Sequence, residues 1–149
     1  MKTILITGAG GYIGTNLVSK LIKLKYKVVA LDTFWFGNYL KKNKRLKILK
    51  KDIRKLDLKD LNNIDTIIHL ASIANDPAAE LNAKLTWDIN VLATYNLIDL
   101  AVKKKIKKFI FASSGSVYGI KKEKKVIEDL PLHPVSEYNK SKMIAERIL

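Results

Sequence analysis

Residues 3–14 read Thr-Ile-Leu-Ile-Thr-Gly-Ala-Gly-Gly-Tyr-Ile-Gly, a short run of branched apolar residues that ends in a cluster of glycines. The apolar part predicts a buried strand over residues 3–7, and the glycines predict a tight turn into a helix. Such a turn lets the backbone approach a pyrophosphate, while the first N–H groups of the helix point at its oxygens. The stretch therefore predicts a dinucleotide-binding loop built on Gly8, Gly11 and Gly14, with a purely structural turn as the alternative.

The rest of the chain alternates between strand and helix patterns. Four more buried strands are expected at residues 27–31, 46–49, 65–70 and 109–112. Helical spacing joins Ile13, Leu17, Leu21 and Leu24, and it recurs over residues 78–104, where Ile89, Leu92, Ala93 and Leu100 share one side. Ser136 is expected to cap a last helix. This alternation predicts an α/β fold, a Rossmann-type doubly wound parallel sheet, in one domain over residues 1–149.

Composition narrows the function. The 149 residues contain no cysteine and only two histidines, so we expect no metal site. The formal charge of +14 comes from 28 Lys and Arg residues, of which three are Arg. Nucleic-acid readers usually rely on arginine, so we interpret the lysines as a solvated surface and expect no nucleic-acid partner. No stretch is long and apolar enough to span a bilayer, and a cytoplasmic protein without a membrane partner is expected.

Polar residues follow the predicted strands at the edge where a parallel sheet binds its ligands. Asp32 comes eighteen residues after Gly14, where a carboxylate accepts hydrogen bonds from the adenosine ribose and repels a 2′-phosphate. NAD is therefore favoured over NADP, with a mere turn-forming role for Asp32 as the alternative. Asp52 and His69 follow the third strand and close the fourth, but they could also be a helix cap and a core histidine.

Two Tyr-x-x-x-Lys pairs occur, Tyr118 with Lys122 and Tyr138 with Lys142, and spacing alone does not separate them. With so many lysines, about one such pair is expected by chance. The second pair follows the predicted helix start at Ser136, so its two side chains would lie one turn apart on one face. An ammonium there would stabilise the phenolate of a tyrosine that acts as a base. This pair is the candidate catalytic one.

These motifs together resemble those of the extended short-chain dehydrogenases/reductases, specifically the NAD-dependent nucleotide-sugar epimerase/dehydratase group and its UDP-glucose 4-epimerase-like members. The matching pieces, in order, are Thr7-Gly8-x-x-Gly11-x-x-Gly14, Asp32, Asp52-Ile53-Arg54, His69-Leu70-Ala71-Ser72, Asn90-Val91, Ser113 to Gly119, and Tyr138-Asn139-Lys140-Ser141-Lys142. They extend over residues 3–149 at close to the family's intervals.

The resemblance implies roles for individual residues. For the cofactor NAD, it places Tyr12 and Ile13 against the pyrophosphate and Asp52 and Ile53 at the adenine. Leu70, Ala71 and Ser72 would lie along the middle of the cofactor. Asn90 would brace the site, either structurally or through water. Ser114 would hydrogen-bond the reacting hydroxyl, Tyr138 would remove its proton, and Lys142 would hold the nicotinamide ribose. Tyr118 would belong instead to the segment after the fifth strand.

The resemblance also implies a reaction. Dehydratases of this group carry Asp-Glu where this chain has Gly115-Ser116, so a dehydratase is not expected. Epimerases often have a lysine near Ile73-Ala74-Asn75, and that phosphate contact is missing here. We expect an NAD-dependent nucleotide-sugar epimerase. The alternatives are a nucleotide-sugar reductase or dehydrogenase of the same family and a non-catalytic NAD-binding remnant.

Members of this group typically continue through further strands and a C-terminal substrate domain. We therefore expect this chain to be an N-terminal fragment, truncated before the last strands and before a substrate domain, and to form a homodimer when full length. If the strand order is 3-2-1-4-5, Phe109, Ile110 and Phe111 would lie on an uncovered edge, and self-association of the chain would follow.

Overall fold

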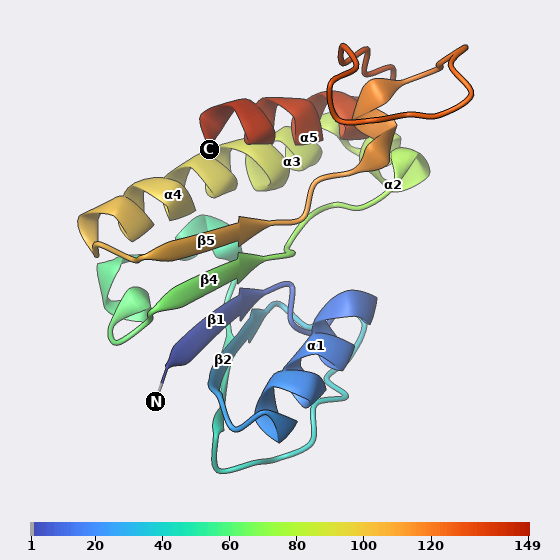
Figure 1. The fold of residues 1–149 in the computed structure, drawn as a ribbon. Coiled ribbons are helices and arrows are strands. Elements are labelled where there is room, and N and C mark those ends of the chain that lie inside the picture. The colour runs from blue at the N-terminus through green and yellow to red at the C-terminus, as the bar shows by residue number, and fades with distance from the viewer. Residues whose placement is uncertain (1) are drawn as a thin grey trace. The chain divides into compact units, whose positions relative to one another are not determined.

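A five-stranded parallel sheet forms the centre of the first of two units in the computed structural model, which describes residues 2–149. This unit runs up to Ala71 and resumes from Asn96 to Ala112. Its strands are β1 (Thr3–Thr7), β2 (Lys27–Asp32), β3 (Leu46–Lys50), β4 (Thr66–His69) and β5 (Lys108–Phe111), in the order β3-β2-β1-β4-β5 (Figure 1). The parallel Rossmann-type sheet and the strand order considered from the sequence are confirmed.

Both faces of the sheet are covered at its centre. Leu5 and Ile6 are neighbours in β1 and point to opposite faces, yet both are 0% exposed. On the Ile6 side, helix α1 (Tyr12–Lys23) packs Val18 against Ile4, Val28 and other branched residues. A doubly wound sheet requires this two-sided burial, because a strand that is apolar on both faces must be covered on both.

The two edge strands are less buried than we expected. The side chains of Lys47, Ile48 and Lys50 in β3 are exposed, and in β5 Ile110 is 42% exposed. The prediction of fully buried strands is wrong there, because an edge strand has a neighbour on one side only. The prediction that β5 forms an edge is confirmed, and self-association through it stays a prediction.

Helix α1 was predicted correctly in position and only partly in orientation. Leu17 and Leu21 pack against the core, but Ile13 and Leu24 are 61% and 68% exposed. Gly14 and Val18 occupy the innermost positions of the helix. A glycine carries no hydrophobic signal, so the apolar pattern missed the point of closest contact between helix and sheet.

The second unit, Ser72–Tyr95 with Ser113–Leu149, is helical. It contains α2 (Asp76–Leu81), α3 (Ala83–Trp87), a π-helical turn (Asp88–Leu92), the start of α4 (Ala93–Lys103), a 3-10 helix (Gly115–Tyr118) and α5 (Glu137–Ile148). Ser136 caps α5 by accepting a hydrogen bond from the Asn139 N–H at 3.1 Å, as expected. The sequence predicts one domain over residues 1–149, and the structure divides into two compact units.

The single helix expected over residues 78–104 is interrupted twice. Asn82 lies outside helical geometry and its side chain caps α3, and the turn at Asp88–Leu92 is π-helical. A π-helical turn widens the helix, so it changes which side chains face inward. Accordingly Leu92 is 62% exposed, against expectation, while Ile89 is buried.

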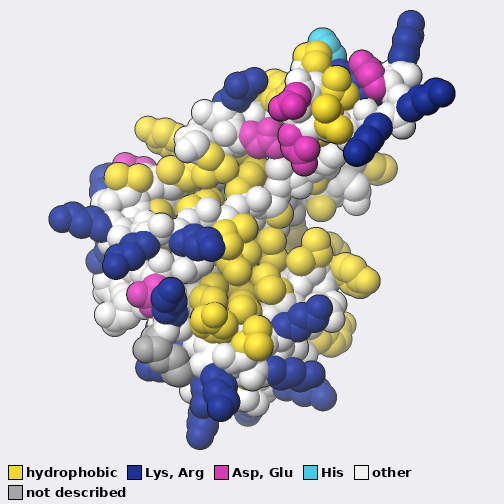
Figure 2. Space-filling model, viewed as in Figure 1, with side chains coloured by type: hydrophobic (Ala, Val, Ile, Leu, Met, Phe, Trp, Pro, Cys, Tyr) yellow, Lys and Arg dark blue, Asp and Glu magenta, His cyan; other side chains and the backbone are white. Residues whose placement is uncertain are grey.

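Surface charge is spread rather than concentrated. Figure 2 shows Lys and Arg side chains distributed around the visible face, with acidic side chains among them. Within residues 2–149, no helix is long and apolar enough to cross a membrane, and no cluster of His, Asp and Glu has the arrangement of a metal site.

Candidate functional site

The glycine loop of the first unit depends on the absence of side chains. Gly8 has φ +71°, and a Cβ there would lie 2.6 Å from the Ala71 backbone nitrogen. A Cβ on Gly14 would collide with the carbonyl oxygen of Gly8. The loop is therefore pressed against both the end of β4 and its own helix, and only glycine permits this packing.

The start of α1 fits an anionic ligand. Gly11 caps the helix and supplies no side-chain acceptor, and the first turn contains no acidic residue. The N–H groups and the positive end of the helix dipole are therefore available to phosphate oxygens. Tyr12 and Ile13, at 90% and 61% exposure, flank this end of the helix, although large apolar side chains usually avoid water.

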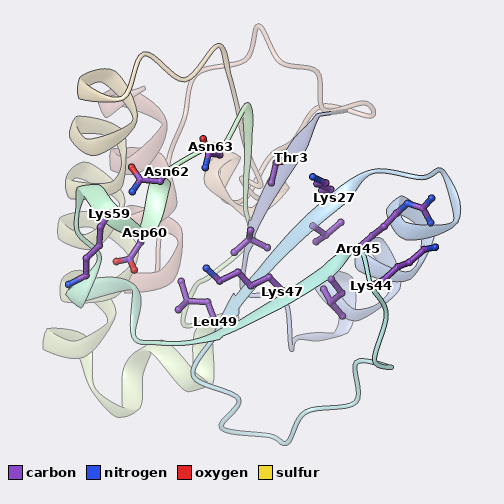
Figure 3. A pocket seen from close by; sticks show the side chains of 13 residues that line it. Thr3, Lys27, Lys44, Arg45, Lys47, Leu49, Lys59, Asp60, Asn62 and Asn63 are labelled. Carbon is purple, nitrogen blue, oxygen red and sulfur yellow. The ribbon is translucent and has the colours of Figure 1, made fainter.

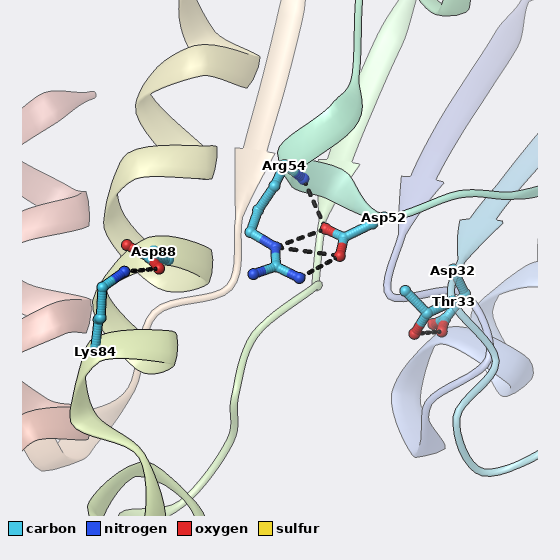
Figure 4. Close-up of polar contacts among 6 residues, drawn as sticks. All are labelled: Asp32, Thr33, Asp52, Arg54, Lys84 and Asp88. Carbon is cyan, nitrogen blue, oxygen red and sulfur yellow. Dashed lines mark hydrogen bonds and ion pairs between the residues drawn. The ribbon is translucent and has the colours of Figure 1, made fainter.

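Asp32 ties the end of β2 to the glycine loop. One carboxylate oxygen accepts a hydrogen bond from the Gly10 N–H at 2.9 Å, and the other accepts one from Phe34 N–H at 2.7 Å. Asp32 and the Thr33 hydroxyl are drawn in Figure 4. The turn-forming role is therefore present, and it holds the half-buried carboxylate beside the loop that the sequence predicts for the pyrophosphate.

Asp52 does act as a helix cap. It accepts a hydrogen bond from the Arg54 N–H at 2.9 Å and an ion pair from the same residue's guanidinium at 2.6 Å (Figure 4). These contacts with Arg54 lower the pKa of Asp52 below its usual value. Its neighbour Ile53 is 5% exposed, so most of that side chain belongs to the core.

His69 is a core histidine with a hydrogen-bond partner, which is the alternative that the sequence also allows. It is 1% exposed, and its Nδ1 lies 2.6 Å from the Thr7 hydroxyl. That hydroxyl already accepts hydrogen bonds from the N–H groups of Leu70 and Ala71, both at 3.2 Å. Because the hydroxyl oxygen serves as an acceptor for these two groups, its proton is available for the contact with Nδ1. The pair fixes the segment after β4 against the glycine loop.

Asn90 is the polar centre of the second unit. It is 2% exposed, and its oxygen accepts hydrogen bonds from Ser72 and Ile73 at 3.1 and 2.8 Å. Its nitrogen donates to the Ile73 carbonyl and the Ser141 hydroxyl, both at 3.0 Å. All four hydrogen-bonding positions of the amide are occupied, which favours the structural role over a water-mediated one. Asn90 thereby connects the segment after Ala71 to helix α5.

Helix α5 carries the tyrosine and lysine, and its first turn is held by residues that the sequence did not single out. The Trp87 indole N–H donates to Glu137 at 2.7 Å, which lowers the pKa of that carboxyl group. The Ser136 hydroxyl donates to Asp76 at 2.6 Å. These contacts join α5 to α2 and α3 just before Tyr138, which is half-buried. Neither Trp87 nor Glu137 stands in a recognisable motif, so only the structure reveals their role.

Lys142 is 4% exposed, unusual for a lysine. Burial lowers the pKa of Lys142 to about 8, and the charge of Glu146 opposes this shift. The amine thus changes its charge far closer to neutral pH than an ordinary lysine does. Such a shift is typical of residues that bind or activate a ligand.

Ser114 caps the 3-10 helix that α5 contacts in the same unit. Its hydroxyl lies 2.7 Å from the Ser116 hydroxyl and accepts a hydrogen bond from the Ser116 N–H at 3.2 Å. The competing pair is disfavoured here: Tyr118 ends the 3-10 helix, and Gly119 follows with φ +69°. Tyr118 and Lys122 therefore do not lie on one helical face.

The predicted site residues fall into two groups. The first unit contains Gly8, Gly11, Tyr12, Ile13, Gly14, Asp32, Asp52, Ile53, Leu70 and Ala71, and the second contains Ser72, Asn90, Ser114, Tyr138 and Lys142. Thus the residues predicted for the phosphates and the adenosine share one unit. The three candidate catalytic residues share the other.

Curated relatives show similarity along nearly the whole chain. A protein of Methanocaldococcus jannaschii named "Putative UDP-glucose 4-epimerase" is 37% identical over 98% of the chain and 49% of its own length. The UDP-glucose 4-epimerase of Lactobacillus helveticus is 31% identical over 98% of the chain and 46% of its own length. The chain therefore spans about half the length of the curated relatives it matches.

Solved structures of similar fold also match nearly the whole chain and about half of their own length. A UDP-N-acetylglucosamine 4-epimerase from Methanobrevibacter ruminantium, in complex with UDP-N-acetylmuramic acid, has a TM-score of 0.92 and 31% identity, over 98% of this chain and 48% of its own. A UDP-glucuronic acid 4-epimerase from Bacillus cereus, in complex with UDP-glucuronic acid and NAD, has a TM-score of 0.88 and 35% identity, over 98% and 50%. The model of the family described as "NAD dependent epimerase/dehydratase family" matches residues 4–149, and the chain belongs to that family.

Proposed function

We propose that this chain provides the NAD-binding and catalytic part of a nucleotide-sugar epimerase. The observation that carries the proposal is that one chain has both a glycine-lined helix start without a side-chain cap and a buried Lys142 one turn after Tyr138. The first feature suits a dinucleotide phosphate, and the second suits proton transfer at a hydroxyl. Relatives named UDP-sugar 4-epimerases support the reaction class.

The first unit would bind the cofactor with groups that already fit it. The α1 N–H groups would bind the pyrophosphate, and Asp32 would accept the ribose hydroxyls with the lone pairs that Gly10 and Phe34 leave open. The carboxylate would repel a 2′-phosphate, so NAD would be bound in preference to NADP. Leu70 and Ala71, held in place by the Thr7 hydroxyl, would lie along the middle of the cofactor.

The second unit would carry out the proton transfer from the sugar hydroxyl. Tyr138 would take the proton from a sugar hydroxyl, and Ser114 would orient that oxygen by a hydrogen bond. Lys142, as an ammonium, would stabilise the phenolate of Tyr138 and bind the nicotinamide ribose. NAD, when bound, would accept a hydride from the sugar carbon and return it to the other face. Asn90 and the Trp87–Glu137 contact would hold α5 in place for these steps.

Incubation of an active form that contains this chain with NAD and UDP-glucose tests this function. Proton NMR should reveal conversion of the sugar to its 4-epimer without net reduction of NAD. Accumulated NADH with a keto sugar would favour the dehydrogenase alternative. NAD binding by calorimetry without either product would favour the non-catalytic remnant. A homodimer and a cytoplasmic location belong to the same proposal, and size-exclusion chromatography and cell fractionation test them.

A further inference from the structure

A strongly basic hollow lies in the first unit, away from the residues predicted for the cofactor. Its volume is about 560 Å³, within the range of small-molecule sites. It is bordered by the start of β1 and β2, by β3 with the residues before it, and by residues 59–63 (Figure 3). The glycine loop and Asp32 belong to the opposite, carboxyl-terminal ends of these strands.

Three cations border this hollow and leave the sheet from one face. The register pairs Thr3 with Lys27, and Val29 with Lys47, while the Val28 N–H donates to the Arg45 carbonyl at 2.9 Å. Lys27, the first residue of β2, and Arg45, the residue just before β3, are therefore neighbours, about 5 Å apart at the backbone. Lys47 follows two residues after Arg45, so it leaves the same face of the sheet, and Figure 3 shows the two side chains extending to different sides of the hollow.

Nearby carboxylates do not neutralise these three charges. Within residues 2–149, Lys27, Arg45 and Lys47 form no ion pair. Asp60 is the acidic residue that lines the hollow, and it is already bound by Lys51 at 2.5 Å. Like charges on neighbouring strands repel one another and destabilise the sheet. An anion would remove this repulsion.

The shape and lining favour a compact anion over a nucleic acid. The residues that line the hollow include no aromatic side chain on which a base could stack, and one arginine. The hollow is also a local, open depression rather than a stripe along the surface. We propose that it binds a small oligophosphate, such as the phosphate chain of a nucleotide, through Lys27, Arg45 and Lys47.

Calorimetry with inorganic triphosphate tests this site. Lys47→Gln and Lys27→Gln should each weaken binding about tenfold, since each removes one charge-assisted hydrogen bond. Lys124→Gln is the matched control, because it removes the same charge from the exposed loop of the other unit. Its affinity should equal that of the original protein. Equal weakening by all three variants, or no binding at all, would overturn the proposal.

Thermal unfolding without phosphate gives a second, independent result. Because the three cations repel one another, Lys47→Gln and Lys27→Gln should raise the melting temperature at low salt, whereas Lys124→Gln should leave it unchanged. If the site binds an anion, the variants that bind triphosphate more weakly should therefore be the ones with the higher melting temperature. Lower stability of both variants would contradict the proposal. It would also be contradicted if the protein bound duplex RNA more tightly than triphosphate and if Lys47→Gln kept that RNA binding. NAD binding should be the same in all variants.

Discussion

The two units build their parts of the site by different means. In the first unit the candidate cofactor residues are positioned by backbone contact: Gly8 and Gly14 pack without side chains, and Asp32 binds two backbone N–H groups. In the second unit side chains bind side chains, as Asn90 binds Ser141 and Trp87 binds Glu137. A backbone-built loop should fail completely when one atom is added, whereas a side-chain network should weaken step by step.

The largest effect is expected at Gly14. Replacement by alanine would place a Cβ against the carbonyl oxygen of Gly8 and against Ala9, and backbone atoms cannot move aside as a side chain can. We expect a loss of about 3 kcal/mol or more in the free energy of unfolding and loss of NAD binding. Urea unfolding and calorimetry measure both.

Gly115→Ala is the matched control, because a Cβ there meets no atom within 4 Å. It should change neither stability nor NAD affinity. If Gly14→Ala proved as harmless as Gly115→Ala, the close packing of the loop would be refuted, and with it the contrast between the two units.

The next effect concerns the buried charge of the second unit. Because the folded-state pKa of Lys142, about 8, lies below the ordinary 10.5, the unfolded chain binds more protons between these values. Stability should therefore rise with pH from about 8 to 10.5, and the penalty should be fully present below pH 8. Lys142→Met should stabilise the protein at pH 7 by about 3 kcal/mol and abolish this rise.

Urea unfolding at several pH values checks this prediction, with Lys124→Met as the control at an exposed position. The same titration bears on catalysis. Above pH 8 the ammonium that stabilises the phenolate is lost, so turnover should decline there. A lysine whose removal destabilises the fold at pH 7 would refute our account of its burial.

A smaller effect is expected at Asn90. Replacement by alanine would leave Ile73 and Ser141 without their partners at a site that is 2% exposed, at a cost of about 2 kcal/mol. Asn96→Ala, at a half-buried position in the other unit, serves as the comparison and should cost less. Hydrogen exchange should quicken in α5 of the Asn90 variant while the sheet stays protected. Uniform loss of protection would show that the two units unfold together.

The smallest effect is expected at Trp87. Its replacement by phenylalanine keeps the aromatic packing but removes the hydrogen bond to Glu137, which should lower the free energy of unfolding only slightly. Because Glu137 precedes Tyr138, kcat should fall while the NAD dissociation constant stays the same. An unchanged kcat would show that this contact serves stability alone.

The sequence predicted the sheet because apolar runs and glycines report directly on buried strands and tight turns. All five strands and the start of α5 were located within a residue or two. The break in the long helix at Asn82 and the π-helical turn were missed, since neither leaves a periodic signal. Trp87 and Glu137 were missed for a related reason: they lie fifty residues apart, and their contact depends on tertiary packing.

The measurement closest to the central claim is single-turnover oxidation of a UDP-sugar, followed by NADH absorbance, in the active protein and in Tyr138→Phe. We expect the variant to bind NAD with unchanged affinity and to form NADH at least about a hundredfold more slowly, because the proton acceptor is missing. An equal rate of NADH formation in the variant would contradict it.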